Sequence, residues 1–182
     1  MSKDIFSSNF FELFGLPVSY DVDLNKIQQQ YMALQKQLHP EKFASGSDLE
    51  KRLSMQQTSR INEAQSTLKD PVLRAIYLLK LKGIDFSLEN ETTMDAGFLM
   101  KQLELRERLE NIKNESEPLD VLDSLAKEVK TSTLSMMDSF AQAFNNDKLD
   151  DAREWIRKWQ FMQKAKKEIN TLSAEIEDEL LS

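Results

Sequence analysis

Apolar residues recur at intervals of three and four along most of the chain, the spacing that places side chains on one face of an α-helix. An early series consists of Leu24, Ile27, Tyr31, Leu34 and Leu38. A longer series near the C-terminus consists of Ala152, Ile156, Trp159, Met162, Ala165, Ile169, Leu172, Ile176 and Leu180. The alternation of apolar and polar residues that is typical of strands is not found. The pattern therefore predicts an all-α protein.

The spacing and the turn residues together divide the chain into helices. They predict helices over residues 10–14, 24–38, 49–68, 72–81, 95–114, 118–145 and 149–181. Asp23 is suited to cap the second of these helices, and Gly15 and Pro17 close the first. The stretch after residue 84 is polar and irregular. We therefore expect an N-terminal domain over 1–84, a linker over 85–95 and a C-terminal three-helix bundle over 96–182.

Composition narrows the possible functions. The 182 residues include no cysteine and one histidine, which excludes disulfides, zinc fingers and cysteine-ligated iron–sulfur clusters. The net charge is −7, and 21 of the 31 acidic residues lie beyond residue 85. Such a protein is not expected to bind nucleic acid or an anionic membrane. Because no apolar run is long enough to span a bilayer and no signal peptide is evident, we expect an unprocessed cytoplasmic protein.

The sequence contains no strong catalytic or metal-binding pattern. The four glycines are isolated, so no phosphate-binding loop is predicted. His39 has no serine or cysteine nucleophile in an evident motif beside it. Glu104 and Glu107 lie one helical turn apart and could bind a metal, but without a neighbouring histidine a solvated face is favoured. We therefore expect no catalytic residues, no metal and no cofactor, and hence a protein that is not an enzyme.

The most informative local feature is the sequence Leu-His-Pro-Glu-Lys-Phe at residues 38–43. A residue before proline is driven toward extended conformations, so His39 should lie on an exposed turn at the end of a helix. That helix carries Lys26 and Lys36 and no acid between Asn25 and Pro40. A positive helix face beside an exposed turn suggests a contact site. The alternative is an ordinary turn between two helices.

The residues around this turn resemble a J-domain, the DnaJ-type module that stimulates the ATPase of DnaK-type chaperones. The residues that carry the resemblance are Tyr31, Leu34, His39, Pro40, Lys42, Ile61, Asn62, Glu63, Ala64, Leu68, Asp70, Pro71, Arg74, Ala75 and Tyr77. The resemblance implies a helical hairpin that docks on the chaperone, with Tyr31, Leu34 and Ile61 in its core. It implies that the chaperone-binding residues are His39, Pro40, Glu41, Lys42, Lys26 and Lys36. The family loop reads His-Pro-Asp, and Glu41 departs from it by one methylene, which moves the carboxylate by about one ångström.

The second half of the chain narrows the resemblance to one family of J-domain proteins. The sequence Phe-Leu-Met-Lys-Gln-Leu-Glu-Leu-Arg-Glu at residues 98–107, together with Lys-Phe-Ala-Ser-Gly at 42–46, is similar to the HscB family of iron–sulfur cluster co-chaperones. The resemblance implies an L-shaped protein whose C-terminal bundle binds an IscU-type scaffold protein. It further implies delivery of that scaffold to an HscA-type chaperone, with stimulation of the chaperone's ATPase during cluster assembly and transfer. The cluster itself belongs to the client.

A helical wheel gives a separate reason to expect a binding surface in this segment. Phe98, Leu105, Leu109 and Ile112 form one stripe, whereas Leu99, Met100 and Leu103 lie on a different side beside Glu104 and Glu107. Apolar residues framed by carboxylates suit an adaptable contact with a polar rim. The alternative is a helix that is wedged between two others and buries both faces.

By the family resemblance Phe161 joins the client-binding residues, which are then Leu99, Met100, Leu103, Glu104, Glu107 and Phe161. Trp155 and Trp159 are assigned to the core, because aromatic residues at helical spacing usually pack there. The competing hypothesis is a helical adaptor that does not stimulate a chaperone, in which Glu41 marks a degenerate J-domain loop. We expect the protein to be a monomer.

Overall fold

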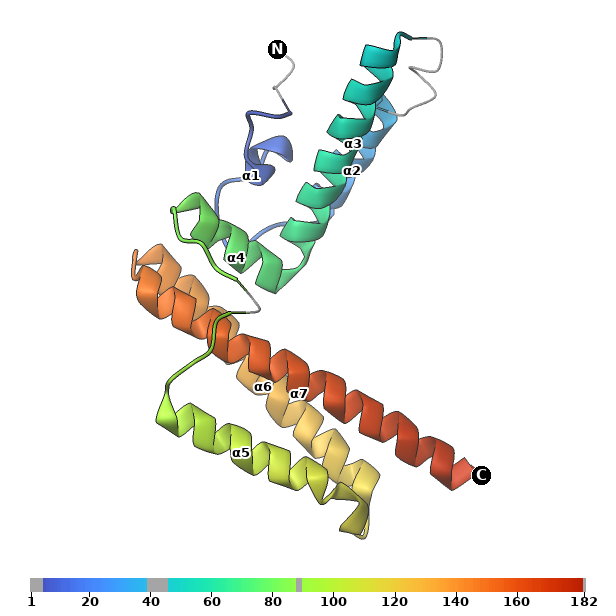
Figure 1. The fold of residues 1–182 in the computed structure, drawn as a ribbon, viewed down its shortest axis with the longest axis vertical. Coiled ribbons are helices and arrows are strands. Elements are labelled where there is room, and N and C mark those ends of the chain that lie inside the picture. The colour runs from blue at the N-terminus through green and yellow to red at the C-terminus, as the bar shows by residue number, and fades with distance from the viewer. Residues whose placement is uncertain (1–4, 39–45, 88–89, 182) are drawn as a thin grey trace. The chain divides into compact units, whose positions relative to one another are not determined.

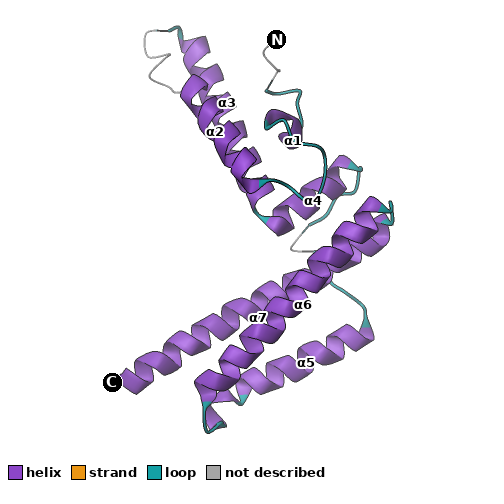
Figure 2. Ribbon diagram, turned by 180° about the vertical axis from the view of Figure 1, so that it is seen from behind, coloured by secondary structure: helices purple, strands orange, loops and turns teal. Residues whose placement is uncertain are grey.

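A computed structural model of the chain describes residues 5–38, 46–87 and 90–181, and every regular element in these ranges is helical. The chain divides into two compact units, Met1–Ile84 and Asp85–Ser182. The helices of both units can be followed in Figure 1 and, from behind, in Figure 2. The predicted all-α fold is confirmed. None of the helices in the described ranges is long and apolar enough to cross a membrane.

The first unit is built on a helical hairpin. It contains α1 (Phe10–Leu13), α2 (Leu24–Leu38), α3 (Asp48–Lys69) and α4 (Pro71–Leu81). Helices α2 and α3 lie side by side in both views (Figures 1 and 2). The fully buried side chains of this unit include Phe11, Phe14, Ile27, Ile61, Leu68, Leu78 and Leu79. Burial of such side chains away from water is the main force that holds the helices together.

Helix α2 buries less of its apolar face than the sequence pattern suggests. Ile27 is fully buried, but Tyr31 and Leu34 are only half-buried and Leu24 is 49% exposed. Helix α2 packs mainly against the single helix α3, so its partner covers only a narrow stripe. The Tyr31 hydroxyl donates a hydrogen bond to Asn62 Oδ1 at 3.0 Å. Leu24 is therefore exposed to water although it belongs to the apolar series, and Tyr31 and Leu34, expected in the core, lie at its edge.

The segment before α2 is fixed to the hairpin by aromatic and polar contacts. The backbone N–H of Phe10 donates to the Tyr77 hydroxyl at 3.0 Å, and the two rings stack with centroids 4.3 Å apart. Arg60 of α3 donates to the carbonyls of Ile5 and Ser8 at 2.7 and 2.9 Å. Burial raises the pKa of the Tyr77 hydroxyl, so it remains a neutral hydrogen-bonding group. These contacts close the first unit around α3 and α4.

The end of α2 is tied to α3 just before the predicted His-Pro loop. The hydroxyl of Ser54, a side chain that is 2% exposed, donates to the carbonyl oxygen of Leu38 at 2.9 Å. Leu38 is the last residue of α2, and the final carbonyls of a helix lack partners within the helix. Ser54 therefore satisfies one of these carbonyls and ties the last turn of α2 to α3.

We expect Ser54→Ala to lower the free energy of unfolding of the first unit by about 1 kcal/mol, because the Leu38 carbonyl loses its hydrogen-bond partner in a partly buried position. Ser59→Ala is the matched control, since Ser59 is exposed on the same helix and gains the same helix propensity. All three tyrosines lie in the first unit, so their NMR resonances during urea unfolding report on it alone. Equal stability of the two variants would contradict the proposed role of the Ser54 hydroxyl.

The second unit is a three-helix bundle, as predicted. It contains α5 (Ala96–Glu110), a short 3-10 helix η2 (Ile112–Asn114), α6 (Pro118–Asn145) and α7 (Leu149–Leu181). Helices α6 and α7 form the main packing pair, and α5 lies along them (Figures 1 and 2). The fully buried side chains of the pair include Leu122, Leu125, Phe140, Ile156 and Trp159.

Three details of this bundle differ from the sequence expectations. The helix predicted over 95–114 ends at Glu110 and continues as the separate helix η2. Leu180, in the last turn of α7, is 72% exposed rather than packed in the bundle. Trp155 is half-buried rather than in the core, whereas Trp159 is 2% exposed as expected. The Trp155 ring lies under the ammonium group of Lys158 at 4.8 Å, a favourable cation–π contact at the edge of the bundle.

Candidate functional site

Helix α5 presents an exposed apolar surface, which we call the α5 patch: Leu99, Met100 and Leu103. Their exposed fractions are 41%, 60% and 53%. Only Phe98 and Leu109 are buried in α5, one near each end of the helix. The alternative of a helix buried on both faces is therefore wrong. An apolar cluster left in water marks a surface suited to a partner.

The remaining predicted client-binding residues lie on the same unit. Glu104 and Glu107 are exposed on α5 with the patch. Phe161 comes from α7, is half-buried and packs its ring edge-to-face with Phe98, at a centroid distance of 6.0 Å. Because Phe98 directly precedes Leu99, this contact holds Phe161 at the end of α5 that carries the patch. Two helices therefore contribute to one candidate surface, and α7 enters it through Phe161.

A groove continues from this surface between α5 and α6. It has a volume of about 300 Å³, and Glu104 lies on its border. Leu105, Val129 and Met162 supply its apolar lining. Arg108 and Glu128 join the two helices across it with an ion pair of 3.1 Å. The sequence pattern did not indicate this groove, because its lining comes from three helices that are distant in sequence.

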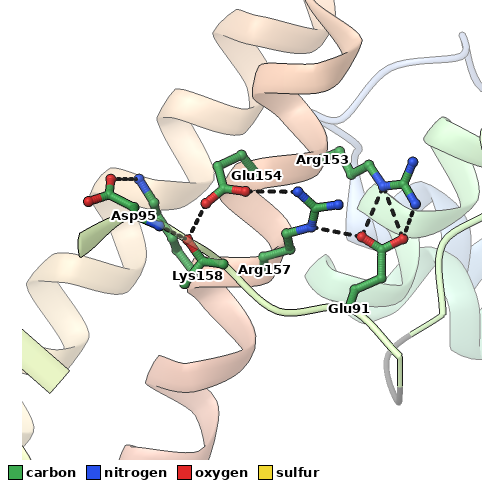
Figure 3. A network of polar contacts seen from close by, with 7 residues as sticks. Glu91, Asp95, Arg153, Glu154, Arg157 and Lys158 are labelled. Carbon is green, nitrogen blue, oxygen red and sulfur yellow. Dashed lines mark hydrogen bonds and ion pairs between the residues drawn. The ribbon is translucent and has the colours of Figure 1, made fainter. Parts of the chain in front are cut away.

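Polar contacts hold the N-terminal end of α5 against α7. The carboxylate of Asp95 caps α5 by accepting from the N–H of Phe98 at 3.0 Å, and its other oxygen pairs with Lys158 of α7 at 2.6 Å. The Lys158 ammonium also lies 5.7 Å from the centre of the Phe98 ring. Figure 3 shows Asp95 and Lys158 at one side of a larger network. Lys158 thus connects the cap of α5 to the aromatic residues that support the patch.

At the other side of the network lies Glu91, whose side chain is only 8% exposed (Figure 3). Arg153 Nε donates to its carboxylate at 2.9 Å and Arg157 Nε at 2.8 Å. Hydrogen bonds from Arg153 and then Arg157 hold the pKa of the Glu91 carboxyl below its ordinary value, although burial opposes them. Sequence reasoning missed this cluster, because Glu91 and its partners are more than 60 residues apart.

The lowered pKa of Glu91 predicts a particular acid sensitivity of the second unit. Above the ordinary pKa of 4.5 the ionised carboxylate contributes fully to stability, and this contribution is lost as the pH falls through the lowered folded-state pKa. The stability difference between the wild-type chain and Glu91→Gln should be constant above about pH 5 and shrink below pH 4.5. Both tryptophans lie on α7, so their fluorescence during urea unfolding measures this unit. A difference that does not change with pH would contradict the assignment.

Two of the predicted chaperone-binding residues, Lys26 and Lys36, lie on α2. Lys36 is exposed on α2. Lys26 is also exposed, but its ammonium donates to the carbonyl oxygen of Gly15 at 2.9 Å and so has a structural role as well. The other residues predicted for this site lie outside the described residues: His39, Pro40, Glu41 and Lys42. Within the described ranges no cluster of three or more potential metal ligands occurs.

Comparison with protein families gives two matches along the chain. Residues 9–77 match a family model described as the DnaJ domain, and residues 94–170 match one described as the HSCB C-terminal oligomerisation domain. A protein of Shewanella halifaxensis named "Co-chaperone protein HscB homolog" is 42% identical over 165 residues, which cover 88% of this chain and 94% of the relative. A protein of the same name from Shewanella pealeana is 41% identical, and the match covers 95% of this chain and 99% of the relative.

Solved structures show the same similarity over both units. The chaperone HscB from Vibrio cholerae superposes with a TM-score of 0.84 at 36% identity, covering 93% of this chain and 99% of the other. The human co-chaperone protein HscB superposes with a TM-score of 0.82 at 30% identity, covering 91% of this chain and 82% of the other.

Proposed function

Since this chain belongs to the HscB family of co-chaperones, we propose that it binds an IscU-type iron–sulfur cluster scaffold protein and delivers it to an HscA-type or other DnaK-type chaperone, whose ATPase it stimulates. In this proposal the chain binds and positions its partners and catalyses no reaction itself. The single observation that supports client binding best is the exposure of the α5 patch, Leu99, Met100 and Leu103.

The chemistry of the patch fits a protein client. Leucine and methionine supply an apolar surface that adapts to the shape of a partner, and Glu104 and Glu107 add a charged border. Phe161 supplies an aromatic side chain of the kind that often contributes most to binding energy. We propose that these six residues contact the scaffold protein together.

The chaperone contact is proposed for the first unit. The helix with Lys26 and Lys36 leads into the loop of His39, Pro40, Glu41 and Lys42. Positive charges on such a surface mainly raise the rate of encounter with an acidic partner and fix its orientation. One chain that carries both contacts raises the effective concentration of the client at the chaperone.

We assign the chaperone-binding domain to residues 1–84, the linker to 85–95 and the client-binding bundle to 96–182. We propose that the protein acts in the cytoplasm, and the expected monomer stays a prediction. The alternative of an adaptor that does not stimulate a chaperone is not favoured by the similarity to named co-chaperones over both units.

Calorimetric titration of the full chain with an IscU-type scaffold protein tests the client half of the proposal. We expect saturable binding at one site, with a negative heat-capacity change because apolar surface of the α5 patch leaves water. A polar contact elsewhere on the chain would give little heat-capacity change. If the titrations show no binding at any of the temperatures used, the proposed client binding is contradicted.

A further inference from the structure

Helix α5 is weakly anchored for a helix that carries a binding surface. Phe98 is its only buried residue within the N-terminal half, and the α5 patch begins at the next residue. Between Leu99 and Arg108 none of its side chains is fully buried. Within this half of the helix, packing therefore fixes the position of the patch relative to Phe161 on α7 only through the ring of Phe98. We infer that further contacts hold the N-terminal end in place.

The preceding residues 91–95 supply such a contact, and we call them the strap. Alternate side chains of the strap face α7: Glu91 bonds to Arg153 and Arg157, the Thr93 hydroxyl to Glu154, and Asp95 to Lys158. Between them Met94 points away and is 83% exposed. This alternation is the geometry of an extended chain laid along a surface. The last strap residue, Asp95, is also the N-cap of α5.

The strap and α7 carry equal numbers of negative and positive charges where they meet, and these charges are partly protected from water. Glu91, Glu154 and Asp95 supply three negative charges, and Arg153, Arg157 and Lys158 supply three positive charges (Figure 3). The Glu91 and Lys158 side chains are only 8% and 12% exposed. Exposed pairs such as Lys113 with Glu179, at 53% and 61%, contribute little to stability. Removal of one partner from a protected pair is much more disruptive, because it leaves the other charge without compensation.

We propose that the strap is a positioning element for client binding: Glu91, Arg153 and Arg157 fix residues 91–95 on α7 and thereby hold the start of α5 so that the α5 patch and Phe161 form one surface. The inference rests on the proposed client-binding function. These residues do not touch the client. They act by keeping the first turn of α5 ordered before the client arrives, which lowers the entropy cost of binding.

Glu91→Gln tests the strap, because it keeps the size of the side chain and removes its charge. We expect the affinity for an IscU-type scaffold protein to fall about tenfold. In the variant, one or two side chains at the start of α5 become ordered only when the client binds, and the entropy cost of this ordering corresponds to about that loss. Glu91→Asp, which restores the charge on a shorter side chain, should recover part of the affinity. Glu179→Gln is the matched control from an exposed pair and should bind within about twofold of the wild-type chain.

Hydrogen exchange of the free protein separates positioning from general damage. In Glu91→Gln the amides of residues 96–100 should exchange faster, while those in the middle of α6 keep their protection. If Glu91→Gln unfolds the bundle, Arg153→Gln provides the milder change, because Arg157 still pairs with Glu91. Stimulation of the chaperone without scaffold protein should be unchanged in both variants.

Two results would overturn the inference. The first is unchanged exchange of residues 96–100, which would mean that the strap does not hold α5. The second is faster exchange with wild-type affinity, which would mean that order at this end is irrelevant to the client. Failure of the proposed function has a different signature: alanine substitutions of the α5 patch would then also leave scaffold binding unchanged.

Discussion

Substitution of Leu99, Met100 and Leu103 together by alanine is expected to weaken scaffold binding about 100-fold, since truncation of hot-spot residues costs about 2 kcal/mol or more and 2.7 kcal/mol corresponds to a factor of about 100. The three side chains are exposed, so their loss leaves no cavity in the bundle. Circular dichroism should therefore show unchanged helicity. Calorimetry of the variant with the scaffold protein measures the effect.

The chain contains a closely matched control for this variant. Leu49, Leu53 and Met55 are also two leucines and one methionine, are exposed on α3 and belong to the other unit. Their replacement by alanine removes as many apolar groups from a different surface. We expect scaffold affinity within about twofold of the wild-type value, the effect typical of surface changes away from an interface. Equal losses in the two triple variants would show that the α5 patch is not a specific client surface.

His39→Gln is expected to abolish the acceleration of ATP hydrolysis by the chaperone. The hydrolysis rate with this variant should lie within about twofold of the rate of the chaperone alone, while the affinity for the scaffold protein stays unchanged. His39 follows the last residue of α2, whose carbonyl accepts a hydrogen bond from Ser54, so we expect the substitution to leave the packing of α2 on α3 intact. Gln56→Ala, an exposed change on α3, is the control. Single-turnover hydrolysis with the cognate chaperone is the measurement.

The same assay decides what Glu41 does. Glu41→Asp restores the family loop sequence and shortens the side chain by one methylene. If positioning of the carboxylate limits the rate, this variant accelerates hydrolysis more than the wild-type chain does. Equal rates would mean that glutamate serves as well as aspartate. Acceleration that survives His39→Gln would contradict the proposed chaperone contact.

The helices and the bundle could be predicted because their signal is local. Apolar spacing of three and four acts within a few residues of the chain, and so does the predicted cap Asp23, whose carboxylate accepts from the N–H groups of Asn25 and Lys26. The same spacing overestimated burial at Leu24 and Leu180, because a pattern states which face is apolar and not how much of it a neighbour covers. The wheel of α5 separated two apolar sides correctly, and the structure shows that the second side is exposed.

The contacts that hold the candidate surfaces in place could not be predicted from the sequence. The bond of Ser54 to Leu38 joins two helices, and the contacts of Glu91 with Arg153 and Arg157 join residues more than 60 positions apart. Charged residues of this kind are usually solvated, and nothing in their spacing distinguishes a protected pair from an exposed one. Lys26 illustrates the same limit, since its bond to Gly15 depends on how the preceding segment folds back.

Single-turnover ATP hydrolysis by the chaperone shows whether one chain joins a client to a chaperone. We expect the full chain to accelerate hydrolysis, and a scaffold protein added at limiting concentrations of the chain to accelerate it further. Alanine substitution of the α5 patch should remove only the further increase, and His39→Gln should remove both. A wild-type chain that leaves the hydrolysis rate unchanged, with and without the scaffold protein, would contradict the account.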